Sequence, residues 1–300
     1  MTVSPGSSAS TASSKPAGSG LLQELAAWLR TTGTADALAA TVAGSAAGPG
    51  LDPLASGPRL VGITEASGAA GDTGDESGTG ATGDRLAAAM QVPTVHRDVA
   101  DTPVDRARDL GAEIADRAAD DGIPLLVLAD PDVPDTTTAA VVGTLCNLEP
   151  VKAHSPAGRT DHAWADEVAV VRDLMFTTRS LRGGPADATK ATGVLDAVGS
   201  PATAAVTGLL ARAAQRRTPV ILDGAASLAA ALLAEALSPG SVSWWLAPHR
   251  PGGAGADAAA AVLDRLQLRP VHDRELGATA GGAGLCVLPL LQAAALSTAR

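Results

Sequence analysis

Acidic and hydroxyl side chains follow an apolar run of the sequence, where they could bind a ligand. Asp130 comes directly after the run 124–129, and Asp135, Thr136 and Thr137 follow it closely. Threonine hydroxyls and free backbone N–H groups at the start of a helix hold anions such as phosphate. Plain helix capping by Asp135 or Thr136 explains the same residues, so both interpretations are kept.

Two further turns carry side chains that suit a ligand, and they follow the apolar runs 219–222 and 242–247. These side chains are Asp223, Gly224 and Ser227 in the first turn and His249 and Arg250 in the second. A simple helix cap would also account for the first turn, and a half-exposed loop pair for the second.

The histidines and cysteines do not show the spacing of a metal site. His96, His154, His162, His249 and His272 form no HxxxH or HExxH pattern, and neither cysteine lies near a histidine. Zinc-type sites depend strongly on ligand spacing, so the sequence predicts no metal. The sequence also has no P-loop and no GxSxG motif, which argues against phosphoryl transfer from ATP and against a serine hydrolase.

Four apolar runs, which we predict to be strands, precede polar turns of this kind and would hold them in place. Each run, at 59–63, 124–129, 219–222 and 242–247, leads into a polar or glycine-rich turn and then an alanine-rich helical segment. Strands that are apolar throughout are typical of a parallel sheet covered on both faces. Ligands of such sheets bind at the carboxyl ends of the strands, where we expect any active site.

Helical segments supply the cover for this sheet. Residues 105–120 show an apolar stripe at helical spacing, and Ser200-Pro201 open a second helix in the N-cap and N1 arrangement. The segments 161–182 and 186–198 are predicted as helices on the other side of the sheet. The segment 66–84 is predicted to be a mobile loop, because it is long and rich in glycine, and its acidic side chains would repel the pyrophosphate of a dinucleotide.

Composition excludes several classes of function. The 300 residues carry a net charge of −10, with 2% aromatic residues. This balance argues against a nucleic-acid binder, which needs a basic surface, and against docking on an anionic membrane. Two cysteines and no apolar span of membrane length predict a reduced, cytoplasmic setting. Residues 1–20 are rich in Ser, Ala, Gly and Pro and are predicted to be a disordered tail.

Four segments, taken in order, carry a resemblance to a known family. They are 111–141, 194–237, 246–250 and 281–295. The chain resembles the nicotinate-nucleotide–dimethylbenzimidazole phosphoribosyltransferases of cobalamin assembly. The resemblance implies a single α/β domain over 21–300, with a Rossmann-like, mostly parallel sheet and helices on both faces. It also implies a small helical unit from about 21–42 and 283–300, and a homodimer.

The resemblance implies a reaction and its ligands. Members of the family displace nicotinate from nicotinate mononucleotide with a benzimidazole nitrogen, which gives α-ribazole phosphate, and need no metal or nucleotide cofactor. The implied partners are therefore small molecules, a benzimidazole or a nicotinate nucleotide. The implied phosphate- and ribose-binding residues are Asp130, Asp135, Thr136, Thr137 and Gly158. Other implied pocket residues are Asp223, Gly224, Ser227, His249, Arg250 and Gly281.

The sequence departs from the family pattern at functional positions. In the loop that reads GEMGIGNTT in the family, Asp132 and Pro134 stand where glycines belong. Proline removes an N–H donor, and a like charge at about 5 Å would cost a bound phosphate on the order of 3 kcal/mol. A lysine of the family is replaced by Glu167, and the catalytic glutamate position is Ala280 or Ala278, depending on the alignment.

Three functions fit this pattern. The first is a working, divergent transferase with Glu275 or Asp273 as the general base. The second is a catalytically silent homologue that acts as a binding or partner subunit, either as a homodimer or in a heterodimer with an intact paralogue. The third is a changed reaction on a non-phosphorylated or cationic ligand, which would suit a site enriched in acids.

Overall fold

Five parallel strands form one sheet in the described part of the chain, in the order β2-β1-β3-β4-β5. The structure is a computed structural model, and it describes residues 20–46, 57–65, 79–276 and 281–298. The strands are β1 (Arg59–Thr64), β2 (Thr94–Asp98), β3 (Leu126–Leu128), β4 (Val220–Leu222) and β5 (Trp245–Leu246).

Alternate residues of the strands pack into two separate cores, one on each face of the sheet. Leu126, Leu128 and Leu222 belong to the first core, whereas Val127 and Ile221 belong to the second. Both sets are buried. This explains why β3 and β4 are apolar throughout rather than alternating with polar residues.

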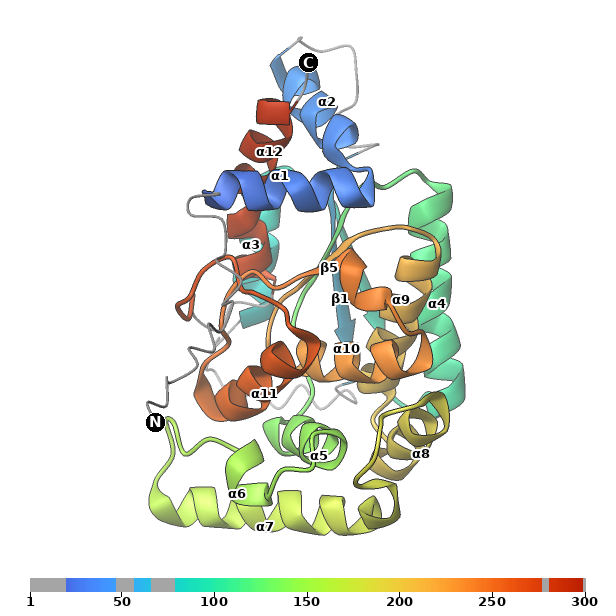
Figure 1. The fold of residues 1–300 in the computed structure, drawn as a ribbon, viewed down its shortest axis with the longest axis vertical. Coiled ribbons are helices and arrows are strands. Elements are labelled where there is room, and N and C mark those ends of the chain that lie inside the picture. Colours follow the sequence, from blue (N-terminus) through green and yellow to red (C-terminus); the bar gives the residue numbers. More distant parts are fainter. Residues whose placement is uncertain (1–19, 47–56, 66–78, 277–280, 299–300) are drawn as a thin grey trace, which may run out of the picture.

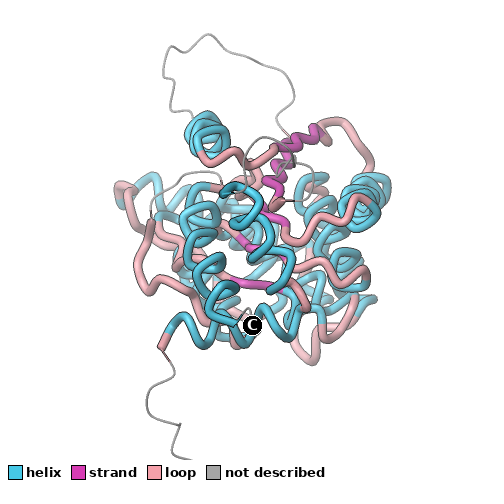
Figure 2. Tube along the Cα trace, turned by 90° about the horizontal axis from the view of Figure 1, so that it is seen from above, coloured by secondary structure: helices cyan, strands magenta, loops and turns pink. Residues whose placement is uncertain are grey.

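Helices cover both faces, as Figure 2 shows from above. The first core includes residues of α4 (Val104–Asp120), α5 (Asp135–Leu145), α8 (Ala188–Val198), α9 (Pro201–Gln215), α10 (Ala225–Leu237) and α11 (Ala256–Leu266). The second core includes residues of α1 (Leu21–Thr32), α2 (Ala35–Ala46), α3 (Thr79–Ala89) and α12 (Gly282–Thr298). The predicted α/β class, with a parallel sheet and helices on both faces, is therefore confirmed.

Helices from the two ends of the chain pack together. Both α1 and α2 contact α12, at the end of the molecule opposite to α5 and α7 in Figure 1. This packing fits the predicted small helical unit, whose boundaries stay a prediction. No helix in the described ranges is long and apolar enough to cross a membrane.

Two predicted helices do not lie on the opposite face of the sheet from α4 and α9. Helix α8 packs into the same core as α4 and α9, through its buried residues Ala191, Val194 and Leu195. Helix α7 (Asp161–Thr177), with α6 (Pro150–Ala153), packs on α5 beyond the carboxyl ends of the strands rather than on a face of the sheet. A third small core explains the placement, because Val171 and Met175 of α7 are buried against Ala139 and Ala140 of α5. The rest of the predicted helix 161–182 is the short 3-10 helix η1 (Arg179–Leu181).

Three further expectations differ from the structure. Strand β2 was not predicted, because its side chains are polar and mostly exposed. The predicted strand 242–247 is shorter, since residues 242–244 belong to the 3-10 helix η2 (Ser241–Trp244). Residues 79–84 of the predicted loop form the start of α3. The rest of that loop, 66–78, and residues 1–19 of the predicted tail lie outside the described residues.

Candidate functional site

Carboxylates follow three of the parallel strands and meet at one edge of the sheet. Glu65 follows β1, Asp130 lies two residues after β3, and Asp223 follows β4 directly. The pairing of Leu128 with Leu222 brings the last two strand ends side by side. Each carboxylate accepts hydrogen bonds from the first turn of a different helix, which places three helix N-termini at this edge.

Asp130 is held by the first turn of α10. Its Oδ1 accepts a hydrogen bond from the backbone N–H of Ser227 at 3.1 Å. Burial raises the pKa of the Asp130 carboxyl to about 8, and the charges of Asp223 and Asp135 act in the same direction. The N–H groups of α10 oppose this rise. Asp130 is therefore a carboxyl group that can exchange a proton near neutral pH.

Gly224 makes room for the Asp130 carboxyl group. A Cβ at this position would lie 1.9 Å from the Asp130 Cγ, and the backbone φ of Gly224 is +86°. Both observations require glycine, since a side chain would clash and left-handed backbone is strained for other residues. Beside it, the Ser227 hydroxyl is buried and has no hydrogen-bond partner among the described residues.

Asp223 and His249 form a buried pair after β4 and β5. Asp223 Oδ2 accepts from the N–H groups of Ala283 at 3.1 Å and Gly284 at 3.4 Å, the first turn of α12. Its Oδ1 lies 3.1 Å from His249 Nε2, although the two atoms lack hydrogen-bond alignment. His249 Nδ1 accepts from the backbone N–H of Leu276 at 3.3 Å, which assigns the proton of a neutral ring to Nε2.

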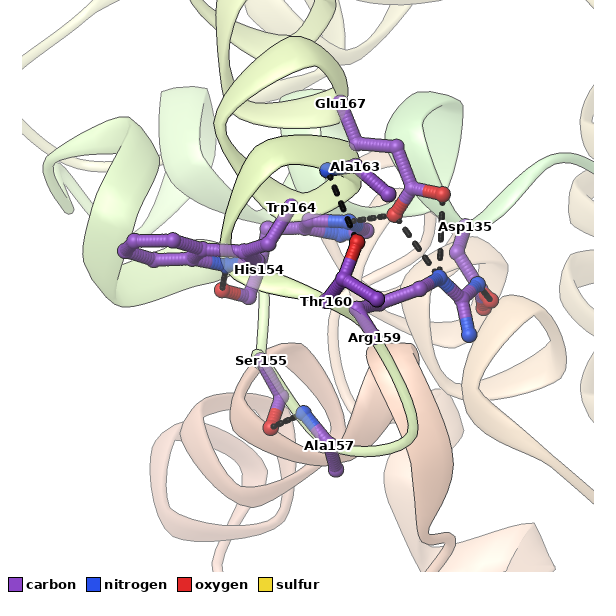
Figure 3. Close-up of polar contacts among 9 residues, drawn as sticks. All are labelled: Asp135, His154, Ser155, Ala157, Arg159, Thr160, Ala163, Trp164 and Glu167. Atoms are coloured by element: carbon purple, nitrogen blue, oxygen red, sulfur yellow. Dashed lines mark hydrogen bonds and ion pairs between the residues drawn. The ribbon is translucent and has the colours of Figure 1, made fainter.

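A network of charged groups lies beside the first turn of α5, as Figure 3 shows. Arg159 Nε donates to both carboxylate oxygens of Glu167, at 2.9 and 3.0 Å. His154 Nε2 donates to Glu167 Oε2 at 2.7 Å. Arg159 Nη2 also lies 3.5 Å from Asp135 Oδ2. The network links the loop before α7, helix α7 itself and the N-terminus of α5.

The surroundings shift the pKa of two acids in this network in opposite directions. The hydrogen bond from His154 lowers the pKa of Glu167, and Arg159 lowers it further against the effect of burial. Burial raises the pKa of Asp135, although Arg159 and His154 act against it. At neutral pH, Glu167 is therefore the firmly ionised member that holds the cation, whereas Asp135 is the more easily protonated acid.

The structure brings together most of the predicted pocket residues. Asp130, Asp223, Gly224, Ser227 and His249 lie at the strand ends described above, beside Asp135, Thr136 and Thr137 at the start of α5. Gly281 precedes α12 with a φ of +79°, and a Cβ there would lie 2.5 Å from Leu60 Cδ1 and 3.5 Å from the Ala129 Cβ.

Other predicted residues lie differently. Gly158 sits in the turn before α7 with a φ of +74° and open space around it. Arg250 is half-exposed and paired with Asp273. The exposed Glu275 has its carboxylate against Gly252. Ala278 and Ala280, the two predicted positions of the catalytic base, lie outside the described residues.

Sequence reasoning missed Glu65 and Arg159. Glu65 directly follows a strand, as Asp223 does, and this shared position is the signal that could have found it. It accepts from the Ser200 hydroxyl and the Ala202 N–H, each at 2.8 Å. Arg159 has no such signal, because its partners lie 8 and 24 positions away in the sequence.

A cavity lies apart from the strand-end carboxylates, and the described residues show no metal-binding cluster. A cavity of about 380 Å³ lies between α1 and the edge strand β5, and none of the strand-end carboxylates lines it. Within the described ranges, no three His, Cys, Asp or Glu side chains are grouped so that they could hold a metal ion.

Known proteins are similar to this chain in sequence and in fold. A model of a phosphoribosyltransferase family matches residues 87–299. The nicotinate-nucleotide–dimethylbenzimidazole phosphoribosyltransferase of Mycobacterium avium (strain 104) is 40% identical over 192 residues, which cover 63% of this chain and 52% of that protein. The protein of the same name from Corynebacterium glutamicum (strain R) is 38% identical over 193 residues, 64% of this chain and 51% of that protein. The chain thus spans about half the length of the curated relatives it matches.

Solved structures show the same fold. CobT from Thermus thermophilus superposes with a TM-score of 0.63 at 21% identity, over 91% of this chain and 95% of that one. A nicotinate-nucleotide–dimethylbenzimidazole phosphoribosyltransferase from the same organism gives a TM-score of 0.62 at 23% identity, over 80% and 81% of the two chains. With the family match over residues 87–299, the chain belongs to the family of the nicotinate-nucleotide–dimethylbenzimidazole phosphoribosyltransferases.

Proposed function

We propose that the chain transfers the phosphoribosyl group of nicotinate mononucleotide to a benzimidazole, such as 5,6-dimethylbenzimidazole, and releases nicotinate. The observation that carries this proposal is the Asp130 carboxyl at the end of β3, whose pKa is raised to about 8. A general base is most effective when its pKa is close to the working pH. Family membership supports the choice of the two substrates.

In the proposed reaction, Asp130 takes the proton that the attacking base must lose. A benzimidazole ring nitrogen forms a bond to C1′ of the ribose, while the bond from C1′ to the nicotinate ring nitrogen breaks and its electron pair stays on that nitrogen. The benzimidazole N–H proton passes to the Asp130 carboxylate. The products are then α-ribazole phosphate, nicotinate and a protonated Asp130.

Glu275 is the other candidate for the base, proposed from the sequence. It is exposed and lies against Gly252, in the segment that Leu276 ties to His249. For Glu275 to serve, its carboxylate would have to move away from Gly252. Asp130 needs no such movement, because the first turn of α10 already holds it at the strand end.

An assay of α-ribazole phosphate formation tests the proposal and separates the two bases. We expect Asp130→Asn to lower kcat by about 10²–10⁴-fold, the usual effect of removing a general base. The wild-type rate should rise with pH towards about 8, where Asp130 becomes ionised. Glu275→Gln should retain the rate, as should Asp109→Asn, a control on an exposed acid of α4 outside the site. Loss of activity only in Glu275→Gln would assign the base to Glu275.

A second candidate function is that of a catalytically silent binding or partner subunit. It is favoured by the way the chain's own carboxylates occupy helix N-termini, with Glu65 on α9, Asp130 on α10 and Asp223 on α12. A ligand phosphate would meet negative charge at each of these places. Thermal shifts that show stabilisation by 5,6-dimethylbenzimidazole but not by nicotinate mononucleotide, together with no turnover, would support this function.

The proposed assembly is a homodimer, or a heterodimer with an intact paralogue. A homodimer is expected to show twice the chain mass of 29.5 kDa in light scattering. A monomer mass for the purified chain would exclude the homodimer.

A further inference from the structure

Arg159 is a cation placed among the carboxylates beside α5, and its orientation is fixed from one side. Its Nε donates to both oxygens of Glu167, at 2.9 and 3.0 Å. Because the guanidinium group is planar, fixing Nε also fixes the directions of the two Nη groups. Figure 3 shows the guanidinium between Glu167 and Asp135.

The anchor of Arg159 is itself held by buried contacts. His154 is fully buried and donates to Glu167 Oε2 at 2.7 Å. Trp164 Nε1 donates to the His154 carbonyl oxygen at 3.0 Å, and the Ser155 N–H donates to the Ala254 carbonyl oxygen at 3.0 Å. The loop before α7 therefore holds Arg159 in place without any contact to a ligand.

The free end of Arg159 faces a much weaker partner. Nη2 lies 3.5 Å from Asp135 Oδ2, longer than the 2.7–2.9 Å of a good charge-assisted hydrogen bond. The side chains of Arg159 and Asp135 are 31% and 42% exposed, so solvent weakens their attraction. Among the described residues, Nη1 of Arg159 and the hydroxyls of Thr136 and Thr137 have no hydrogen-bond partner.

We propose that Arg159 recognises the anionic group of the ligand, a phosphate monoester, and that Asp135 occupies Arg159 in the ligand-free chain and is displaced when the ligand binds. The identity of the anion rests on the proposed function. In this arrangement Glu167 is a positioning residue, and Asp135 is an internal competitor that weakens anion binding.

Displacement of Asp135 is physically reasonable. Exposed ion pairs contribute so little that breaking one changes an equilibrium constant by less than about fivefold. A phosphate, by contrast, can accept two parallel hydrogen bonds from the two Nη groups of arginine, which a single carboxylate oxygen at 3.5 Å does not do. The ligand therefore gains more at Arg159 than Asp135 loses.

Titration calorimetry with inorganic phosphate and with ribose 5-phosphate tests this proposal, and ribose serves as the uncharged control. We expect Arg159→Ala to lower the affinity for both anions by about 10-fold or more, because a charge-assisted contact is lost. Asp135→Asn should raise the affinity for both anions by about 3- to 10-fold, because it removes a like charge and frees Arg159. A merely structural role of Asp135 would not produce tighter binding.

Two further variants, a control and a variant of the residue that positions Arg159, complete the test. Arg172→Ala removes an arginine of α7 whose one ion-pair partner in the described part of the chain is the neighbouring Asp173, and it should leave both affinities unchanged. Glu167→Gln should weaken anion binding less than Arg159→Ala, because the guanidinium remains but is less well oriented. Unchanged affinity in Arg159→Ala, or equal or weaker binding in Asp135→Asn, would overturn the proposal. Since these titrations require no turnover, an inactive chain that still shows the two opposite effects would refute the proposed reaction and leave this inference standing.

Discussion

His249 and Asp223 meet across the ends of β5 and β4, with Nε2 and Oδ1 3.1 Å apart and both side chains 4% exposed. Each residue also holds a second part of the chain. Asp223 accepts from the first turn of α12, and His249 accepts from the N–H of Leu276. The pair thus connects the sheet to the segments on both sides of residues 277–280.

Replacement of His249 should therefore destabilise the fold. We expect His249→Ala to lower the free energy of unfolding by about 1–3 kcal/mol, because the Leu276 N–H loses its acceptor and the buried Asp223 oxygen loses its neighbour. Urea unfolding at neutral pH measures the change. His162→Ala is the control, since His162 is 92% exposed and should change stability by less than about 0.5 kcal/mol. Equal stability of the two variants would contradict a structural role of the pair.

Asp130 should make stability depend on pH in an unusual direction for an acid. The native carboxyl keeps its proton up to about pH 8, whereas an unfolded aspartate loses it near about pH 3.9. Between these values the native state binds more protons, so its stability falls as pH rises. The contribution of Asp130 to the free energy of unfolding falls by at most about 1.4 kcal/mol per pH unit, and it is lost as the pH rises through 8.

Asparagine at position 130 removes this proton exchange. Asp130→Asn should therefore lose less stability than the wild type between pH 5 and 8, as measured by urea unfolding at a series of pH values. Parallel curves for the two proteins would show that Asp130 already ionises at its ordinary pKa in the native state.

Much of the fold could be predicted because burial on both faces leaves a simple pattern in the sequence. Strands β1, β3 and β4 read as apolar runs, and the acids that follow β3 and β4 were predicted as pocket residues for that reason. Strand β2 lies at the edge of the sheet with exposed polar side chains, so it left no such pattern.

Side chains that bond to nearby backbone explain where the predicted strand 242–247 was wrong. Ser241 and Ser243 donate to the carbonyl oxygens of Ser238 and Gly240, and Glu235 accepts from the Val242 N–H. These bonds compete with sheet pairing and favour a tight turn. They depend on the preceding helix α10, so the apolar letters alone did not reveal them.

The candidate site could be predicted only where its residues follow a strand. The contact of Arg159 with Asp135 spans 24 positions, and that of Glu65 with Ala202 spans 137. Such contacts arise from the packing of whole helices. The packing of α7 was predicted wrongly, so the residues around Glu167 could not be predicted either.

Glu167 should affect stability at acidic pH. Its pKa is lowered by the hydrogen bond from His154 and by Arg159, so its contribution is present above the unfolded pKa of about 4.3 and is lost as pH falls through the lower native value. We expect Glu167→Gln to lower stability by about 1–2 kcal/mol at pH 7 and to show a weaker loss below pH 4. Glu113→Gln is the control, because Glu113 forms one exposed ion pair on α4. If both variants showed the same acid dependence, the network around Glu167 would contribute nothing specific.

The packing of α4 on α9 should tolerate no side chain at Gly111. A Cβ there would lie 1.8 Å from the Ala205 carbonyl oxygen, and one at Gly208 would lie 2.0 Å from the Arg108 carbonyl oxygen. The two glycines thus let the helix backbones touch directly. We expect Gly111→Ala to lower the free energy of unfolding by about 1–3 kcal/mol despite the higher helix propensity of alanine.

Thermal and urea unfolding would measure this loss, with Gly20→Ala as the control. No atom of the described ranges lies within 4 Å of a Cβ placed on Gly20, whose φ is −63°, so alanine fits there. A Gly111→Ala protein as stable as the wild type would mean that α4 can move away from α9 without cost. Because Ser200 at the start of α9 is bonded to Glu65 at the end of β1, such a movement would also be expected to shift the edge of the candidate site.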